Sequence, residues 1–409
     1  MQDREEQQLA DRTVSTTDGN SADGPVLIVG ASVRSAAQSA LRSGMRPIGA
    51  DCFADQDLLA VADVLPMHNY PDDLPRLAAD APPGPWMYTG ALENYPEIIA
   101  KISTDRPLWG NPAEVVRTVR DPFQLREVLQ TAGLPTADLR CSAHPPEPNR
   151  RWMLKPIRGS AGRGIEIWDE SSTRSPTLDE PHYFQQRLTG RPLSALFVAT
   201  EDSCRLIGIA RQFVGRVELH APRFAFCGAI APIDPGDAIR DNIRRHGEFL
   251  ARCCELRGLF GIDFLCDDHQ PRLTDVNPRY TATVELFEHA FGVPLLREHR
   301  RAFGDDGTAP AQPCDFPTRA DHLVAKAILY ADHDRAIPDT ISALGTGRPA
   351  DGSDPPIVAD IPAFGTQIRA GHPICTLFAA GQTERECLRV LRHRVRTARQ
   401  NLTGSITRP

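Results

Sequence analysis

The sequence predicts a multidomain protein that combines the α/β and α+β classes. A continuous apolar run at residues 25–30 is followed by helical spacing and a second apolar run at 46–50, which is the pattern of a β-α-β unit. Residues 193–230 instead contain alternating strands with no helix between them, which is typical of an antiparallel sheet. Residues 318–409 contain short strand-like runs and one closing helical stretch, which indicates a small β-rich C-terminal part.

Composition excludes several classes of protein. With 409 residues, 41% of them hydrophobic, the chain can form about two to four domains with buried cores. The net charge is only -7 and the basic residues are scattered, so we expect no nucleic-acid partner and no membrane-binding patch. Residues 1–24 are polar and no apolar run approaches the ~20 residues of a membrane span, which predicts a cytoplasmic protein with a disordered tail. The ten cysteines form no Cys-x-x-Cys pair and are expected to be reduced thiols.

Residues 25–115 are expected to form one small doubly wound domain. Strands at 25–30 and 46–50 are followed by a strand at 86–89 and a helix at 92–102. The first turn, GASVRSAA, contains one glycine where a dinucleotide-binding turn has three. A structural turn is therefore favoured over an NAD site, and a dehydrogenase is disfavoured.

A glycine-rich loop follows the strand at residues 151–154. Lys155 ends that strand and is one of only three lysines in the chain, while KPIRGSAGRG continues into a strand at 165–168. Backbone N–H groups of such a loop can close over phosphates, and a lysine adds positive charge. No Gly-Lys-Ser/Thr enters a helix, so this is not a P-loop, and a plain hairpin loop is the alternative. The candidate phosphate-binding residues are Lys155, Gly159, Ser160, Gly162 and Gly164.

Residues 259–285 carry the most specific pattern of the chain. Two strands, 259–265 and 272–277, are joined by a polar turn and predict a hairpin. Side chains two apart share a face, so Asp275, Asn277 and Arg279 are expected to lie together with Asp263 of the partner strand. Oxygen ligands gathered in this way suit Mg²⁺ that carries phosphates, and a solvated hairpin face is the alternative. The candidate metal ligands are Asp263, Asp275 and Asn277.

The order of these parts resembles the ATP-grasp superfamily over residues 25–400, and within it the predicted ATP-dependent carboligases (carboxylate-amine ligases) related to biotin carboxylase. The lid segment KPIRGSAGRG, the hinge strand QQRLTG and the hairpin ending DVNPR occur in that family's order. The resemblance implies an ATP-grasp fold with an N-terminal Rossmann-like pre-ATP-grasp domain and a barrel-sandwich-like C-terminal module. The implied divisions are a tail (1–24), a pre-ATP-grasp domain (25–115), a lid subdomain (116–185), a metal and substrate subdomain (186–305) and a C-terminal module (318–409).

The same resemblance implies roles for single residues. Lys155 would contact the α- and β-phosphates under the closing glycine loop, and Asp263 and Asp275 would take the places of two magnesium-binding glutamates. Arg279 would face the transferring phosphate or the substrate. The implied adenine hinge consists of Gln186, Arg187 and Leu188. The catalytic candidates are Arg279, Lys155 and Arg211, although Arg211 lies within a strand and its side chain faces either solvent or a charged site.

Three departures from the family pattern affect the site. Pro122 stands where the family has a second lysine, and Arg120 or Arg117 are the nearby alternatives. Gln186 replaces a hinge glutamate. Beyond Arg279 the pattern fails to align, and residues 280–285 are where we expect the acceptor substrate.

The resemblance implies activation of a small carboxylate by ATP with Mg²⁺ (or Mn²⁺), followed by capture of the acyl phosphate by an amine or a similar nucleophile. The partners would be small-molecule acids and amines, and the protein could form a homodimer. Two alternatives stay open. One is a bicarbonate-using carboxylase of the biotin carboxylase type, and the other is an ATP-binding module without catalysis.

Overall fold

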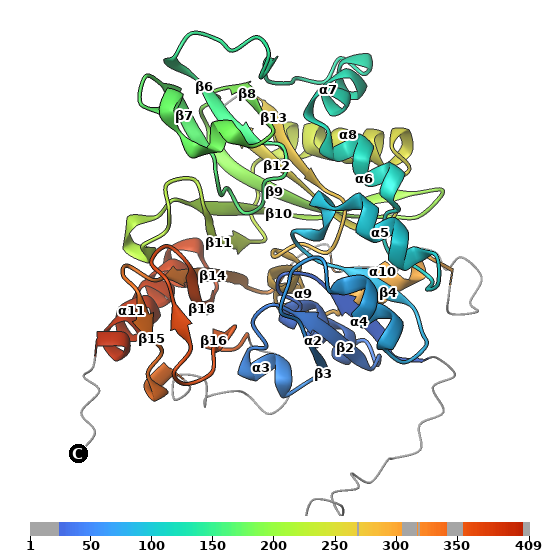
Figure 1. Ribbon diagram of the computed structural model, residues 1–409, viewed down its shortest axis with the longest axis vertical. Coiled ribbons are helices and arrows are strands. Elements are labelled where there is room, and N and C mark those ends of the chain that lie inside the picture. The colour runs from blue at the N-terminus through green and yellow to red at the C-terminus, as the bar shows by residue number, and fades with distance from the viewer. Residues whose placement is uncertain (1–23, 268–269, 305–316, 318–319, 342–354, 404–409) are drawn as a thin grey trace, which may run out of the picture.

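The computed structural model describes residues 24–267, 270–304, 317, 320–341 and 355–403. Most of the predicted tail therefore lies outside the described residues. Figure 1 shows an N-terminal domain in blue beside a large central sheet, with a small sheet in green above it. Within the described ranges, no helix combines the length and the apolar character that a membrane crossing requires.

The N-terminal domain is built on a parallel sheet in the order β3-β2-β1-β4. Its strands are β1 (Val26–Val29), β2 (Pro47–Asp51), β3 (Asp63–Pro66) and β4 (Trp86–Tyr88). Its helices are α2 (Arg34–Arg42), α3 (Gln56–Leu59), α4 (Leu74–Asp80) and α5 (Pro96–Ser103), with a short 3-10 turn, η1 (Leu92–Asn94). The fully buried β1 pairs in parallel with β2, so the predicted β-α-β opening is confirmed. Strands β1 and β4 are neighbours, and Gly90, just beyond the carboxyl end of β4, lies against Arg279, which follows β13 of the central sheet.

A lid follows two connecting helices, α6 (Ala113–Arg120) and α7 (Pro122–Thr131). The second helix begins where it does because the Asp121 side chain accepts the backbone N–H groups of Phe123 and Gln124, and Pro122 needs no such partner. The lid sheet has the antiparallel order β5-β8-β6-β7. Its strands are β5 (Leu139–Cys141), β6 (Asn149–Pro156), β7 (Glu166–Asp169) and β8 (His182–Gln186).

The central sheet contains eight described strands in the order β13-β12-β9-β10-β11-β14-β18-β16. They are β9 (Arg191–Ala199), β10 (Cys204–Val214), β11 (Phe226–Ala231), β12 (Gly258–Cys266), β13 (Pro271–Asn277), β14 (Leu323–Tyr330), β16 (Val358–Ala359) and β18 (Pro373–Gly381). A separate two-stranded pair joins β15 (Arg335–Ala336) to β17 (Gln367–Ile368). Three strands of the expected C-terminal module, β14, β18 and β16, therefore continue the central sheet, because β14 pairs with β11.

Helices cover both faces of the central sheet. The helices are α8 (Asp237–Cys253), α9 (Val284–Phe291), α10 (Leu295–Arg301) and α11 (Glu384–Thr403). On one face α8 packs with Ile262 and Phe264, and α11 packs on β14 and β18 in a neighbouring core. On the other face, residues such as Leu196 and Ala210 meet Phe287 of α9 and the N-terminal helix α2. This second face, which the lid also approaches, carries the candidate site.

Candidate active site

Two aspartates face each other on the hairpin of β12 and β13. Asp263 pairs directly with Asp275, while their neighbours Ile262 and Val276 point into the opposite core under α8. This alternation follows from the period of two in a strand, and the predicted hairpin is confirmed. Burial raises the pKa of Asp263 to about 6, and the negative charge of Asp275 raises it as well. Two carboxylates in this setting would each be stabilised by a cation between them.

The donor set at this hairpin suits a hard divalent cation. The Asp263 carboxylate accepts hydrogen bonds from Gln212 Nε2 at 2.9 Å and from Asn277 Nδ2 at 3.2 Å. No group of three or more His, Cys, Asp or Glu side chains suited to a metal occurs in the described part of the chain. A metal held here would therefore rely on Asp263, Asp275 and the Asn277 amide, with its remaining positions filled by phosphate oxygens or water, which is the usual manner of Mg²⁺. The three assignments stay predictions.

Arg279 lies just beyond the hairpin and is fixed from two sides. Its NH2 group donates to Asn277 Oδ1 at 3.1 Å and to Glu93 Oε1 at 2.6 Å, and its NH1 group donates to the Tyr280 carbonyl at 3.0 Å. The guanidinium also rests against Gly90, where an added Cβ would lie 3.5 Å from it. Burial opposes the positive charge, but Glu93 raises the pKa of Arg279. The predicted catalytic arginine thus stands between the hairpin and the N-terminal domain.

Lys155 and the glycine loop belong to the lid. Lys155 pairs with Tyr183 across β6 and β8, on the face opposite the small apolar core of the lid, and its Nζ donates to Gln185 Oε1 at 2.8 Å. The loop is anchored because Phe226 N donates to the Ala161 carbonyl at 3.2 Å. Gly162 has a φ of +78° and presses against the Phe224 carbonyl, so a side chain there would overlap the backbone. Glycine is therefore required at position 162.

Arg120 joins the lid to the hairpin. Its NH1 group donates to Asp275 Oδ1 at 2.6 Å, and its NH2 group donates to the Gly159 carbonyl at 3.1 Å and to Asn94 Oδ1 at 3.3 Å. Burial would lower the pKa of Arg120, but Asp275 and Glu93 raise it. Of the two arginines considered in place of the absent lid lysine, Arg120 reaches the site and Arg117 is exposed.

Three of the predicted hinge residues lie at the end of β8. Gln186 and Arg187 are exposed and Leu188 is half-buried. The Gln186 side chain accepts the Asp138 N–H at 3.3 Å, which ties the hinge to the strand before it. Nothing in this geometry tests an adenine contact, so the hinge remains a prediction. Ser160 is half-buried within the lid loop.

Arg211 is not brought together with the other candidates. Its neighbour Gln212 contacts Asp263, so alternation along β10 places Arg211 on the opposite face of the sheet. There its guanidinium pairs with Glu384 at the start of α11 and lies 5.6 Å from the Phe213 ring centre. The prediction that Arg211 is catalytic is therefore not supported by its position.

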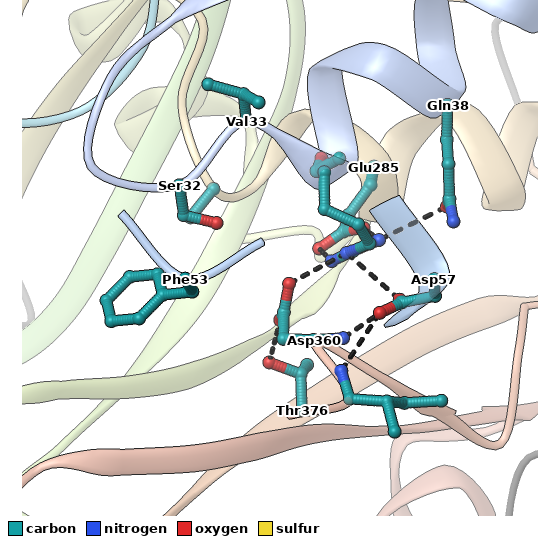
Figure 2. A network of polar contacts seen from close by, with 12 residues as sticks. Ser32, Val33, Gln38, Phe53, Asp57, Glu285, Asp360 and Thr376 are labelled. Carbon is teal, nitrogen blue, oxygen red and sulfur yellow. Dashed lines mark hydrogen bonds and ion pairs between the residues drawn. The ribbon is translucent and has the colours of Figure 1, made fainter. Parts of the chain in front are cut away.

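Residues 280–285, where the acceptor was expected, are buried except for the exposed Ala282, and the segment is anchored at Glu285. Lys326 Nζ donates to Glu285 Oε1 at 2.7 Å, and Arg34 NH1 donates to Glu285 Oε2 at 2.9 Å. Arg34 also meets Asp360 at 2.7 Å and Asp57 at 3.5 Å. Figure 2 shows Glu285, Asp57 and Asp360 gathered by these bonds. The segment is thus a buried joint between the N-terminal domain and the central sheet that fixes the backbone behind Arg279.

Several residues of the site carry no motif that would have identified them. Glu93 and Asn94 come from the turn η1 after β4, and Gln212 comes from the middle of β10. Glu93 is only 2% exposed, which is unusual for a carboxylate. The one available signal was its position just past a buried parallel strand, where site residues of α/β domains gather.

The site can be compared with known proteins. Residues 119–283 match the model of the ATP-grasp domain family. The chain is 25% identical over 213 residues to the large chain of carbamoyl phosphate synthase from Beutenbergia cavernae, a match that covers 47% of this chain and 19% of that protein. This chain therefore corresponds to about a fifth of that relative's length.

Solved structures resemble the fold over nearly its whole length. An L-amino acid ligase from Bacillus licheniformis has a TM-score of 0.69 at 14% identity, covering 91% of this chain and 98% of that one. A biotin carboxylase from Campylobacter jejuni, solved as a β-γ-ATP complex, has a TM-score of 0.65 at 13% identity, covering 89% of each. Both likenesses concern the fold alone. The matched domain includes Lys155, the glycine loop, both aspartates and Arg279. Residues 119–283 are an ATP-grasp domain, and the chain has the fold of the ATP-grasp superfamily.

Proposed function

We propose that the protein is an ATP-dependent ligase that activates a small-molecule carboxylate as an acyl phosphate and joins it to an amine. The observation that carries the proposal is the convergence of two distant parts, the lid with Lys155 and the hairpin with Asp263, Asp275 and Arg279. Arg120 bonds to both parts. A site of this kind works by positioning and charge neutralisation, and it requires no protein nucleophile.

The proposed reaction has two steps. An oxygen of the acid's carboxylate bonds to the γ-phosphorus of ATP while the bond to the β,γ-bridging oxygen breaks, and ADP leaves with that electron pair. The amine nitrogen, after losing one proton, bonds to the acyl carbon as the carbon–oxygen bond to phosphate breaks. Phosphate leaves with the electron pair and the nitrogen releases a second proton.

Each group of the site has a task in this scheme. Lys155 and the N–H groups of the glycine loop would hold the phosphates, and Arg279 would hold the carboxylate near the γ-phosphorus. Mg²⁺ or Mn²⁺ held by the two aspartates would neutralise phosphate charge. Asp263 lies next to Asp275 in a buried setting that raises its pKa, and this supports a cation site between the two.

The test is ADP release in a screen of candidate acids with and without amines, with the condensed product identified by mass. Asp263→Ala and Asp275→Ala should lower ADP release by at least about a hundredfold, because each removes a charge that neutralises the reacting complex. Asp202→Ala, at an exposed carboxylate in the turn between β9 and β10, is the control and should keep wild-type turnover. Thermal unfolding checks that each variant is folded. Normal turnover in either hairpin variant would overturn the proposal.

A bicarbonate-using carboxylase is the second candidate, favoured by the likeness to biotin carboxylase. Incorporation of labelled bicarbonate into product would support it over the ligase. ATP binding without ADP release across the full screen would instead indicate an ATP-binding module without catalysis.

A further inference from the structure

Three polar atoms beside Arg279 are buried and have no hydrogen-bond partner among the residues that the structure describes. They are Glu93 Oε2, Arg279 Nε and the Tyr70 hydroxyl. Glu93 and Arg279 bond to each other through other atoms, at 2.6 Å, so the free oxygen and the free N–H lie on one ion pair. A buried polar atom without a partner destabilises the fold, so such a group indicates a missing ligand or water.

The three side chains come from different parts of the chain; Glu93 and Arg279 are in direct contact, and Tyr70 lies within electrostatic range of both. Glu93 lies in η1 after β4, Tyr70 lies in the loop between β3 and α4, and Arg279 follows the hairpin. Burial raises the pKa of Tyr70, and the negative charge of Glu93 raises it further while Arg279 lowers it, so the hydroxyl is within electrostatic reach of both.

The lid covers this place. The Tyr70 ring packs edge-on against Tyr95 at 6.0 Å between ring centres, and Arg158 at the start of the lid loop lies 5.4 Å from the Tyr95 ring. A molecule bound here would be shielded from bulk water. An acyl phosphate needs such shielding because water would otherwise hydrolyse it.

The charges define the chemistry of the bound molecule. Burial would raise the pKa of Glu93, but Arg279 lowers it below its usual value, so Glu93 is an ionised carboxylate with one unused oxygen. The free Glu93 oxygen can only accept a hydrogen bond, so it requires a donor, while the Arg279 Nε–H requires an acceptor. An ammonium group on Glu93 and Tyr70, beside an acid's carboxylate oxygen on Arg279, satisfies all three atoms. An anionic second substrate such as bicarbonate would instead face the Glu93 charge.

We propose that Glu93 and Tyr70 form the acceptor site and that the acceptor is a primary amine which binds as its ammonium ion. The proposal rests on the proposed ligase function and names the substrate class of that reaction. It places the amine directly beside the carboxylate that Arg279 would hold, so nucleophile and acyl carbon are neighbours before the reaction begins.

The experiment separates activation of the acid from capture by the amine. Hydroxylamine, which is largely uncharged at neutral pH, traps acyl phosphates as hydroxamates and needs no ammonium site. Wild-type protein is first given ATP, hydroxylamine and a panel of acids, and formation of hydroxamate with ADP reports activation. Absence of hydroxamate with every acid would contradict the ligase function itself. The acid that gives most hydroxamate is then paired with ethanolamine, L-alanine and tyramine as probe amines.

Glu93→Gln removes the charge partner of Arg279, so it should lower both reactions, but it should lower kcat/KM for the probe amines by about thirtyfold more than it lowers hydroxamate formation. This additional factor corresponds to one charge-assisted hydrogen bond of about 2 kcal/mol. Tyr70→Phe should lower kcat/KM for the probe amines by about three- to tenfold, and it should leave hydroxamate formation within about threefold of wild type. Glu114→Gln, at an exposed carboxylate on α6, is the matched control and should change neither rate.

Three results would overturn the inference. Equal losses of hydroxamate and amide in Glu93→Gln, with no selective loss in Tyr70→Phe, would mean that Glu93 only holds Arg279 in place. Unchanged amide rates in both variants would mean that the free atoms bind an ordered water only. Hydroxamate formation by wild-type protein with no reaction of any probe amine would mean that the acceptor is not an ammonium ion.

Discussion

Replacing Glu285 with glutamine is expected to lower the free energy of unfolding by about 3 to 5 kcal/mol. Glu285 is 3% exposed in its side chain and accepts bonds from Arg34 at 2.9 Å and from Lys326 at 2.7 Å. Without the carboxylate, Arg34 keeps Asp360 and Asp57, but Lys326 keeps only neutral acceptors, the Ala282 carbonyl and the glutamine amide oxygen, among the residues that the structure describes. The cost is therefore that of a buried ammonium without a counter-charge, which is far larger than the cost of one hydrogen bond.

Two further variants isolate this cause. Adding Lys326→Met to Glu285→Gln removes the unpaired ammonium, so the double variant should recover about 2 kcal/mol or more relative to the single one. The exposed pair Arg244 and Glu248 has the same contact distance of 2.7 Å, with 47% and 41% exposure. Glu248→Gln should therefore cost no more than about 0.5 kcal/mol.

The effect of Glu285 should also depend on pH. Burial would raise the pKa of Glu285, but the charges of Arg34 and Lys326 hold it well below its usual value. A depressed folded-state pKa gives stability that is complete above the unfolded-state pKa, about 4.3, and is lost as the pH falls toward the folded-state value. The difference between wild type and Glu285→Gln should thus be constant from about pH 8 to pH 5 and should shrink below about pH 4.

Urea unfolding followed by tryptophan fluorescence measures these differences, since the chain has four tryptophans. A Glu285→Gln variant within about 1 kcal/mol of wild type would refute the reasoning, because the buried charge would then be compensated elsewhere. A double variant no more stable than the single one would refute it as well. Loss of ADP release in Lys326→Met without loss of fold would indicate that the joint also sets the position of Arg279.

Three shorter predictions concern the lid and the core. Gly162→Ala should reduce ADP release by at least about tenfold, because its Cβ would overlap the Phe224 carbonyl. Gly159→Ala is the comparison, since its Cβ would lie 3.3 Å from the nearest atom, Pro156 Cγ, and it should change ADP release by about threefold or less. Arg120→Ala should raise the KM for ATP by about tenfold and increase protease cleavage of the lid loop, since the guanidinium holds that loop to the hairpin. Burial lowers the pKa of His299 from 6.5 to about 4. The stability that the neutral imidazole contributes is therefore lost as the pH falls below 6.5, and the loss amounts to about 3 kcal/mol of unfolding free energy at pH 4. Urea unfolding of His299→Gln should lack this part of the pH dependence.

The hairpin could be predicted from sequence because its information is local. Asp263 and Asp275 lie on strands joined by one short turn, and the period of two sets which side chains share a face. The sequence information for the glycine loop is also local, because the positive φ values at Gly162 and Gly164 favour glycine whatever surrounds the loop.

The remaining contacts of the site depend on the packing of distant segments. Glu93 and Arg279 are separated by 186 residues and Arg120 and Asp275 by 155, and no periodicity specifies such pairs. For Arg211, the sequence did not specify on which face of the sheet its side chain lies. Its face is set by the register of β10, which contains an irregularity between Leu206 and Gly208, and a shift of one residue would exchange its place with Gln212.

The charges of the site explain why metal and nucleotide should bind together. The candidate site contains three carboxylates and three cationic side chains, namely Asp263, Asp275 and Glu93, and Arg120, Arg279 and Lys155. Arg120 pairs with Asp275 and Arg279 pairs with Glu93, while Lys155 donates to the neutral Gln185. The site without ligands is therefore close to neutral, with Arg120 on Asp275 where a metal ion would compete for the same oxygen. A metal ion alone must displace that cation, and a nucleotide alone must approach two aspartates. If the two bound as one unit, the metal would cancel the phosphate charge and Arg120 would be free to turn from Asp275 toward the phosphates. Arg120, the candidate for the place of the family's lid lysine, would then serve the ligand-free site and the loaded site in turn.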